Sequence, residues 1–354
     1  MKKFALLYSE NLKEYDLGHV LTQERYQHFM DLFSEKLGGH PDFEIVTPAP
    51  ASHADLLLVH TEDYIRRIER LESRDPWDTP LSAGLVRAAK LLAGAGKLAG
   101  ELTFSGRYRK SFVVGGGVQH ANRTQERGFG VFSDVGVCAE HLKQNFGVQR
   151  ILVIDTDAHA GEGLYDIFCE DSQVLSISVH QNPATLYPGR GFVNEIGCGA
   201  GRGYAVNVPL PPRSGDQVYE YVLEEIFAPL AEEFAPEIIL MVDGSDPHYT
   251  DRLTNMGVTL AGIRMIGAMI SRKAEEVCQG RVVDFVGSGY SADPNMVSWG
   301  WLASITGVCG IDLELGEPRP LPAAIRPDTG LAEAKEMARS LKSELAGYWR
   351  CFSA

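Results

Sequence analysis

The sequence has no paired cysteines and no long hydrophobic segment, and these two absences narrow the class of protein. Its six cysteines are scattered over 354 residues, with no CxxC pair and no spacing typical of a metal finger. In a chain of this length we expect them to be reduced thiols. No window approaches the roughly 20 apolar residues of a membrane span. The apolar run after the two N-terminal lysines is too short for the core of a signal peptide. We therefore expect a soluble, cytoplasmic protein.

The sequence also has no excess of basic residues. Asp and Glu outnumber Lys and Arg by 47 to 33, which gives a formal net charge of -14. Proteins that bind nucleic acid usually carry a basic patch or stripe, so we expect no nucleic-acid partner. A negative field favours cationic ligands, although an acidic surface can equally serve only to keep a protein soluble. The hydrophobic fraction of 44% and the charged fraction of 23% match a folded globular chain.

Short apolar, β-rich runs alternate with longer stretches of helical periodicity along the chain. The predicted strands begin at Phe4, Phe43, Leu56, Ser111, Arg150, Val174, Tyr204, Glu237 and Arg281. The predicted helices span Gln23–Leu37, Ala83–Leu102, Tyr219–Glu233, Leu260–Val277 and Leu331–Leu345. Several strand runs are continuously apolar, as in strands covered on both faces. This alternation predicts a single α/β domain over residues 1–354, with a doubly wound, mainly parallel β-sheet flanked by helices.

Four polar segments each follow one of these strand runs, and they indicate where a site would form. Their sequences are HAN, DTDAHAGEG, DGSDPH and GSGY. In open parallel sheets, ligands bind beyond the carboxyl ends of the strands. We therefore expect these four segments to converge on one site.

Three residues in these segments have side chains that suit a metal ion. Directly after a strand, residues two apart can point the same way, so Asp157 and His159 can face one ion. Asp246 adds a carboxylate from a later strand end. One imidazole and two carboxylates suit a divalent catalytic metal and leave positions for water and substrate. On spacing alone, a hydrogen-bonded loop cap is an equally good interpretation of the DxH pair.

The chain as a whole resembles the histone deacetylase and acetylpolyamine amidohydrolase superfamily. The resemblance runs in order from about Tyr15 to about Gly307. The motifs that carry it are YDLGHVLTQER, LLLVHTEDYI, GGGVQHA, GFGVFSDVGVCA, IDTDAHAGEG, SISVHQ, YPGRG, YAVNVPLP, DGSDPHYTDRL and GSGY. So many ordered motifs make coincidence a poor explanation. The resemblance implies the arginase-deacetylase fold.

By position in these motifs, the resemblance implies that Asp157, His159 and Asp246 bind zinc or ferrous iron. It implies that Tyr290 donates a hydrogen bond to the substrate carbonyl oxygen and that His120 acts as general base and acid. The implied reaction is hydrolysis by a metal-activated water. It would remove an acetyl or other acyl group from an N-acylated amine, such as an acetylpolyamine or acetyl-lysine.

The resemblance also implies residues around the reaction centre. Phe129 and Tyr187 correspond to the aromatic walls of a narrow acyl tunnel, and Leu253 lies close to its mouth. Plain packing is the alternative interpretation for the two rings. Asp78 corresponds, through a looser match, to a rim carboxylate that orients the substrate backbone. The implied structural potassium site consists of Asp155, Asp157, His159, Ser178 and Val179.

The sequence departs from the family pattern at the histidine pair, which is Gln119-His120 here. In the usual arrangement an acidic residue backs each histidine; Asp155 would back the first position, and Glu162, where aspartate is more usual, the second. Glutamine can hydrogen-bond water or Asp155 but cannot gain a proton near neutral pH. Two interpretations follow. Either the enzyme works with one histidine and an altered pH profile, or the protein is a weakly active or non-catalytic member that binds metal or an acyl ligand.

A ureohydrolase with two metals is a further alternative, because arginase-like enzymes share this general fold. Such enzymes show DAHxD and SxDxD runs, whereas this chain has Gly161 and His248 at the positions of two second-metal carboxylates. We therefore expect a mononuclear site, with His248 as a hydrogen-bonded loop residue or an auxiliary ligand. The expected partner is a small-molecule or peptidyl N-acyl amine, and the sequence leaves a homo-oligomer open.

Overall fold

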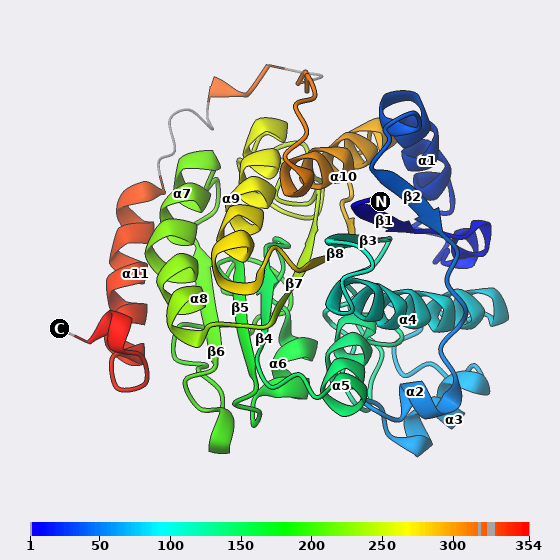
Figure 1. The fold of residues 1–354 in the computed structure, drawn as a ribbon, viewed down its shortest axis with the longest axis horizontal. Helices are drawn as coiled ribbons and strands as arrows, with labels where there is room; N and C mark the ends of the chain where they lie inside the picture. The colour runs from blue at the N-terminus through cyan, green and yellow to red at the C-terminus, as the bar shows by residue number, and fades with distance from the viewer. Residues whose placement is uncertain (1, 318–319, 324–329, 354) are drawn as a thin grey trace.

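A computed structural model describes residues 2–317, 320–323 and 330–353. Within these residues, eight strands form one sheet in the order β2-β1-β3-β8-β7-β4-β5-β6, and each pair of neighbours is parallel (Figure 1). The strands are β1 (Phe4–Leu7), β2 (Phe43–Val46), β3 (Lys110–Val114), β4 (Ile151–Asp155), β5 (Val174–Gln181), β6 (Ala205–Leu210), β7 (Ile238–Gly244) and β8 (Val282–Ser288).

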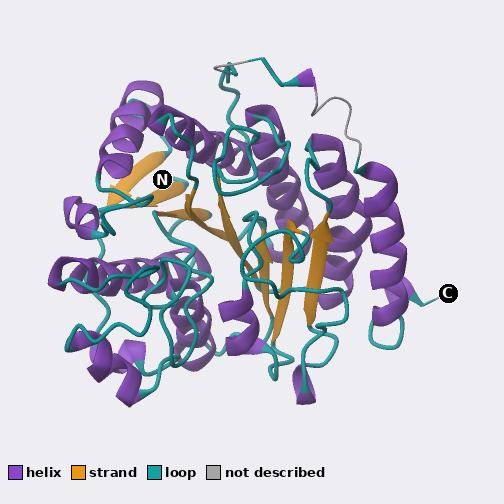
Figure 2. Cartoon of the chain, turned by 180° about the vertical axis from the view of Figure 1, so that it is seen from behind, coloured by secondary structure: helices purple, strands orange, loops and turns teal. Residues whose placement is uncertain are grey.

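Helices cover both faces of this sheet (Figures 1 and 2). One layer contains α1 (Glu24–Leu37), α10 (Pro294–Cys309), α9 (Leu260–Cys278), α7 (Asp216–Val222), α8 (Ala228–Phe234) and α11 (Leu331–Leu345). The other contains α2 (His53–Leu56), α3 (Glu62–Glu69), α4 (Ala83–Phe104), α5 (Asp134–Phe146) and α6 (Glu162–Phe168). A π-helical turn, Leu223–Phe227, joins α7 to α8. The structure confirms the predicted doubly wound parallel sheet.

The central strands are buried on both faces, which explains their unbroken apolar sequences. Every residue of β3, β4 and β7 is buried. At the edge, β2 has only Phe43 buried, because one side of it has no neighbouring strand. Sequence periodicity therefore reports the depth of a strand in this sheet as well as its existence.

The strand predicted from Leu56 is wrong. His53–Leu56 forms the short helix α2, which Ser52 and Asp55 cap reciprocally: each side chain accepts a hydrogen bond from the other's backbone N–H. Leu56 and Val59 are buried, whereas Leu57 between them is 44% exposed. The apolar run thus has one buried face at helical spacing, and the capping pair decides between helix and strand.

No helix among the described residues is long and apolar enough to cross a membrane.

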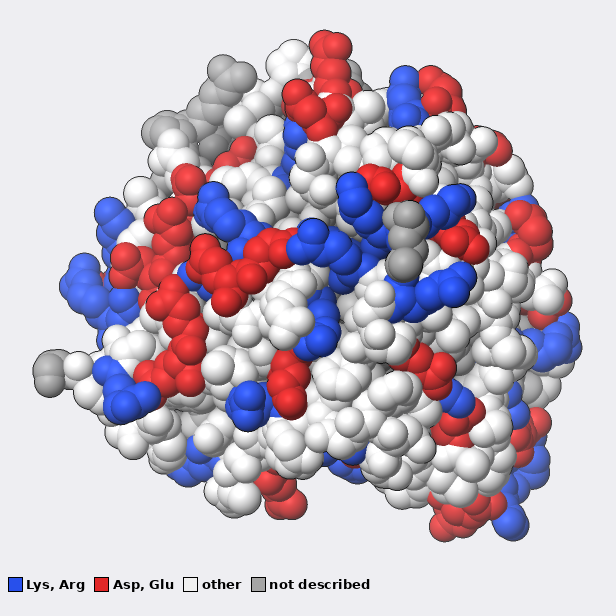
Figure 3. Space-filling model, viewed as in Figure 1, with Lys and Arg blue, Asp and Glu red and all other residues white. Residues whose placement is uncertain are grey.

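On the face seen in Figure 1, acidic and basic side chains lie interspersed (Figure 3).

Two acidic side chains, Asp243 on β7 and Asp284 on β8, lie inside the protein between the sheet and α10. They are 3% and 0% exposed, and the hydroxyl of Ser304 is within hydrogen-bonding distance of both. Oδ1 of each has no hydrogen-bond partner in the described part of the chain. Burial raises the pKa of Asp243 to about 7, and burial together with the Asp243 charge raises the pKa of Asp284 well above its usual value. The folded protein therefore binds protons here that the unfolded chain releases near pH 4.

We expect the melting temperature to fall as the pH rises from 6 to 8.5, because the folded protein holds these protons more tightly than the unfolded chain does. Asp284→Asn removes one buried charge and keeps a hydrogen-bond donor for Asp243. At pH 8.5 it should melt about 2 °C or more above the wild type, while the two proteins differ less at pH 5.5. Thermal unfolding at equal metal content measures this. Parallel pH dependence in both proteins would show that the two carboxyls do not interact.

Candidate metal and catalytic site

The strand order places the four polar segments next to one another. HAN, GSGY, DGSDPH and DTDAHAGEG follow β3, β8, β7 and β4, and these are four consecutive strands of the sheet. All four strands point the same way, so their carboxyl ends share one edge. Segments far apart in the sequence therefore meet at one place because of the strand pairing.

At this edge Asp157, His159 and Asp246 form a compact buried group. One ligand atom from each lies within 4.8 Å of the other two. His159 Nδ1 is 3.1 Å from Oδ1 of Asp157 and 2.9 Å from Oδ2 of Asp246. The exposed fraction of each residue is 7% or less. Within the described residues this is the one group of three or more such side chains close enough to hold a metal ion.

Hydrogen bonds from neighbouring residues fix the three side chains. Oδ1 of Asp246 accepts hydrogen bonds from the Ser288 hydroxyl at 2.7 Å and from the Ala158 N–H at 3.3 Å. Oδ1 of Asp157 accepts one from the backbone N–H of His159 at 2.7 Å. Oδ2 of Asp246 and Oδ1 of Asp157 both remain directed to His159. Such outer partners orient metal ligands and tune their basicity.

The electrostatics of the three residues fit a bound cation. Burial alone would lower the pKa of His159, but its contacts with Asp157 and Asp246 raise it to about 10. Burial, and then the Asp157 charge, raise the pKa of Asp246 to about 8. Without an ion, the group thus binds protons to offset two buried carboxylates. A divalent ion would displace those protons and supply the missing positive charge, so the donor set fits such a metal.

His120 lies beside this group and forms a pair with Glu162, the first residue of α6. His120 Nδ1 is 2.6 Å from Oε2 of Glu162, and both residues are buried. The His120 ring is 5.9 Å from the His159 ring, centroid to centroid. The hydrogen bond that the His120 ring makes to the described residues is at Nδ1, so Nε2 is available for proton transfer.

The turn that carries His120 is held by a buried carboxylate. Asp134, at the start of α5, accepts hydrogen bonds from the backbone N–H groups of Gly117 at 2.9 Å and Val118 at 3.0 Å. Gly128 lies against the ring of His120 with a φ of 55°, and a Cβ there would overlap the ring. Both features fix where the imidazole lies.

Gln119 precedes His120. A glutamine here can hydrogen-bond water or Asp155, but within the described residues the side chain of Gln119 makes no hydrogen bond to Asp155. Oδ2 of Asp155 is buried and has no partner in the described part of the chain. Burial, and then the Asp157 charge, raise the pKa of Asp155 well above its usual value. β4–β5 pairing places Asp155 beside Ser178. A buried carboxylate oxygen without a partner is compatible with the potassium site predicted from Asp155, Asp157, His159, Ser178 and Val179, whose role stays a prediction.

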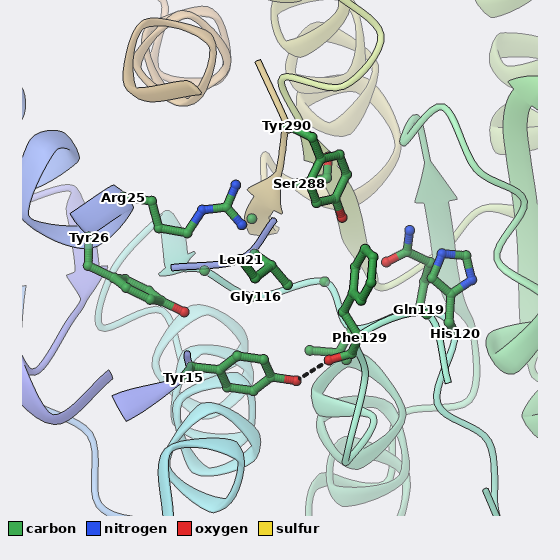
Figure 4. Close-up of a pocket in the computed structure, with 15 residues that line it drawn as sticks. Tyr15, Leu21, Arg25, Tyr26, Gly116, Gln119, His120, Phe129, Ser288 and Tyr290 are labelled. Carbon is green, nitrogen blue, oxygen red and sulfur yellow. Dashed lines mark hydrogen bonds between the residues drawn. The ribbon is translucent and has the colours of Figure 1, made fainter. Parts of the chain in front are cut away.

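Tyr290 and Phe129 close another side of the site, where their rings stand next to each other (Figure 4). Their centroids are 5.7 Å apart, and the Tyr290 ring is 6.2 Å from that of His159. The backbone N–H of Tyr290 donates to Oδ2 of Asp251 at 2.6 Å. The Tyr15 hydroxyl donates to the Phe129 carbonyl at 2.8 Å. The hydroxyl of Tyr290 makes no hydrogen bond within the described residues, so it can donate one to a ligand.

The remaining predicted substrate residues surround this centre. Tyr187 is 45% exposed, and its ring is 5.2 Å from His120. Leu253, 37% exposed, lines a hollow together with Tyr290. Oδ2 of Asp78 accepts the backbone N–H of Phe129 at 3.3 Å. The structure thus brings all four substrate residues to the same region, and Asp78 additionally fixes the loop of Phe129.

Two residues near Tyr290 have roles that the sequence analysis does not identify or resolve. Asp251 holds the backbone of Tyr290 and also accepts the Leu253 N–H at 2.8 Å; its position inside the DGSDPHYTDRL motif was an available signal. Arg25 is buried and donates to the Gly289 carbonyl. Its guanidinium lies 5.8 Å from the centre of the Tyr290 ring, and both residues line one cavity.

His248 lies away from the three candidate ligands. Its Nε2 is 3.0 Å from Glu317 and its Nδ1 is 2.9 Å from the Thr250 hydroxyl. It is therefore a hydrogen-bonded loop histidine. Together with Gly161 at the other second-metal position, this arrangement does not support a binuclear site.

Comparisons with known proteins agree with this arrangement. A model of the histone deacetylase domain matches residues 19–307. A protein named "Probable deacetylase" from Archaeoglobus fulgidus is 34% identical over 358 residues, covering 98% of each chain. The acetoin utilization protein AcuC of Bacillus subtilis is 31% identical over 304 residues, covering 82% of this chain and 78% of AcuC. The solved HDA15 HD domain covers 100% of this chain and 97% of its own, with a TM-score of 0.86 at 23% identity, which is a likeness of fold.

We expect the metal-stripped protein to bind one zinc ion per chain at this group. Because the ligands come together only in the folded chain, zinc should stabilise it by about 2.7 kcal/mol at a free concentration 100 times the dissociation constant. Calorimetric titration and thermal unfolding measure both quantities. Asp246→Asn and His159→Ala should abolish the effect, whereas Asp171→Asn, which removes a surface carboxylate paired with Lys143, should not. Undiminished binding by both site variants would place the ion elsewhere.

Proposed function

The chain belongs to the histone deacetylase domain family, and from that premise we propose that it is a metal-dependent amidohydrolase that removes an acetyl or other acyl group from an amine. The observation that carries the proposal is the convergence of five side chains at one sheet edge. Three of them, Asp157, His159 and Asp246, can hold a metal ion. The other two, His120 and Tyr290, each keep beside that group a polar atom that has no partner among the described residues.

We assign the metal role to Asp157, His159 and Asp246, with zinc or ferrous iron as the ion. A divalent ion there supplies Lewis-acid activation of water and of the scissile carbonyl. Potassium is assigned to Asp155, Asp157, His159, Ser178 and Val179, and it would satisfy the unpartnered oxygen of Asp155. In this proposal residues 1–354 act as one catalytic domain.

His120 is assigned as general base and acid. Glu162 holds its Nδ1, so Nε2 can take a proton from the attacking water and then deliver it to the leaving amine nitrogen. Because Gln119 cannot be protonated near neutral pH, His120 must perform both transfers. The carboxylate of Glu162 stabilises the imidazolium form that His120 takes between the two transfers.

Tyr290 is assigned as the hydrogen-bond donor to the carbonyl oxygen of the substrate. Burial, and then the charges of Asp157 and Asp246, raise the pKa of Tyr290 well above its usual value. The hydroxyl therefore stays protonated and can donate at any physiological pH. A donor aimed at the oxyanion stabilises the transition state more than the ground state.

The rings of Phe129 and Tyr187 suit an aliphatic stem between the amide and the rest of the substrate. One ring lies beside Tyr290 and the other beside His120. Acetylated polyamines and acetyl-lysine both have such a stem. The net charge of the chain and the rim carboxylate of Asp78 favour cationic amines among these substrates.

A second candidate function follows from Gln119. Where a second histidine is required for turnover, the same pocket would bind metal and an acyl ligand without hydrolysing it. The observation that favours this alternative is the glutamine at position 119, which cannot be protonated near neutral pH.

Zinc-loaded protein should hydrolyse at least one of an acetyl-lysine peptide and N-acetylputrescine. Tyr290→Phe should lower kcat about 10²–10³-fold, as expected for removal of one oxyanion donor. Tyr348→Phe removes a surface hydroxyl whose partner in the described part of the chain is Arg202, and it should leave kcat unchanged. Release of free amine measures the reaction. One bound metal per chain without turnover of either substrate would favour the binding function instead.

The two members of the altered pair should differ in importance. His120→Ala should lower kcat/KM about 10²–10⁴-fold because it removes the proton-transfer group. Gln119→Ala should cost less than about tenfold, which corresponds to one neutral hydrogen bond. Steady-state kinetics at equal zinc content distinguish the two. Equal losses in both variants would show that Gln119 takes part directly in the reaction.

A further inference from the structure

Arg127 occupies a junction between three parts of the proposed site. Its Nε donates to the carbonyl of His120 at 3.0 Å and lies 3.4 Å from Oε1 of Glu162. Its Nη2 donates to Asp166 at 2.6 Å. Through its own backbone it exchanges hydrogen bonds with Gly130, on the far side of Phe129. One side chain thus contacts the backbone of the base, the partner of the base and the helix that carries that partner.

The two oxygens of Glu162 have different partners. Oε2 faces His120 at 2.6 Å, whereas Oε1 faces Arg127 and accepts the Tyr187 hydroxyl at 3.4 Å. The carboxylate is buried, so an oxygen turned away from these partners would lose its hydrogen bonds. A charged donor at Oε1 therefore holds the other oxygen, Oε2, toward Nδ1 of His120.

Glutamate needs such support more than aspartate does. Its side chain has one more rotatable bond, so more conformations compete with the one that reaches His120. A guanidinium is suited to hold it because its planar donors bind a carboxylate and a carbonyl at fixed angles. Since Gln119 leaves one histidine for both proton transfers, an error in its orientation cannot be compensated by the neighbouring side chain.

We propose that Arg127 is a positioning residue, which holds Glu162 in the conformation that orients His120 for proton transfer. The inference rests on the proposed function, because it assigns the oriented group to that reaction. Arg127 does not itself contact the reacting atoms.

Arg190 provides a matched control. It also binds Asp166, at 2.9 Å, and it lies on the segment that carries Tyr187, but among the described residues it makes no hydrogen bond or ion pair with Glu162 or His120. Loss of either arginine removes one cation from Asp166. Only loss of Arg127 removes the contact with Glu162.

The test compares kcat and KM for Arg127→Met, Arg127→Lys and Arg190→Met at equal zinc content. Arg127→Met should lower kcat about 10- to 100-fold, with KM and bound zinc nearly unchanged. Arg127→Lys should recover part of the loss, and Arg190→Met should retain the wild-type kcat. In a Glu162→Gln background, Arg127→Met should cause no further loss, because its effect passes through that carboxylate. A wild-type kcat in Arg127→Met, or an equal loss in Arg190→Met, would overturn the inference.

A second readout does not need turnover. The Nδ1 proton of His120, held by Glu162, should give a downfield proton NMR signal, assigned by its absence in His120→Ala. Arg127→Met should remove or shift this signal, and Arg190→Met should not. An unchanged signal would overturn the positioning role. Absence of hydrolysis by the wild type, with the signal behaving as expected, would instead contradict the proposed function and leave the positioning role supported.

Discussion

The pairing of β4 with β7 is the interaction on which the rest of the site depends. Their register runs from Ile151 opposite Ile238 to Asp155 opposite Val242, and it brings Asp246 to His159 across 87 residues of chain. A bulge between Asp243 and Gly244 follows, where β7 leaves regular pairing with β8. Because β3 and β8 continue the same sheet, the strand geometry that places the metal ligands also places His120 and Tyr290.

The same edge concentrates negative charge where the protein is least able to solvate it. Asp155, Asp157 and Asp246 are each 1% exposed or less. Buried carboxylates without a counter-charge are destabilising. In the metal-free protein this region therefore lowers the free energy of unfolding, and the apolar packing of the surrounding sheet must offset that cost. The Ser288 hydroxyl and the backbone N–H groups of Ala158 and His159 reduce the cost locally. The arrangement favours binding of a cation over stability of the empty site.

Sequence patterns predict most of the fold because the buried strands and the one-sided helices carry simple periods. They do not reveal α10, since Met296 to Val308 is buried almost all round and shows no period. They predict a strand at Leu56, where the capping pair of Ser52 and Asp55 favours a helix instead. Motifs predict which residues gather at the site, yet the contacts of Arg127 and the unpartnered oxygen of Asp155 depend on atomic distances between segments that no spacing rule relates.

The sheet order has a consequence for how the chain is made. Of the eight strands in the described sheet, β8 is the last to be synthesised, yet it lies in the middle of the sheet between β3 and β7. Until residues 282–288 leave the ribosome, β2-β1-β3 and β7-β4-β5-β6 can form only as two half-sheets, each with an open, apolar edge. Such edges pair readily with other chains. The nascent protein is therefore most exposed to aggregation just before the strand that joins the two half-sheets and that leads directly to Tyr290 in the reaction centre.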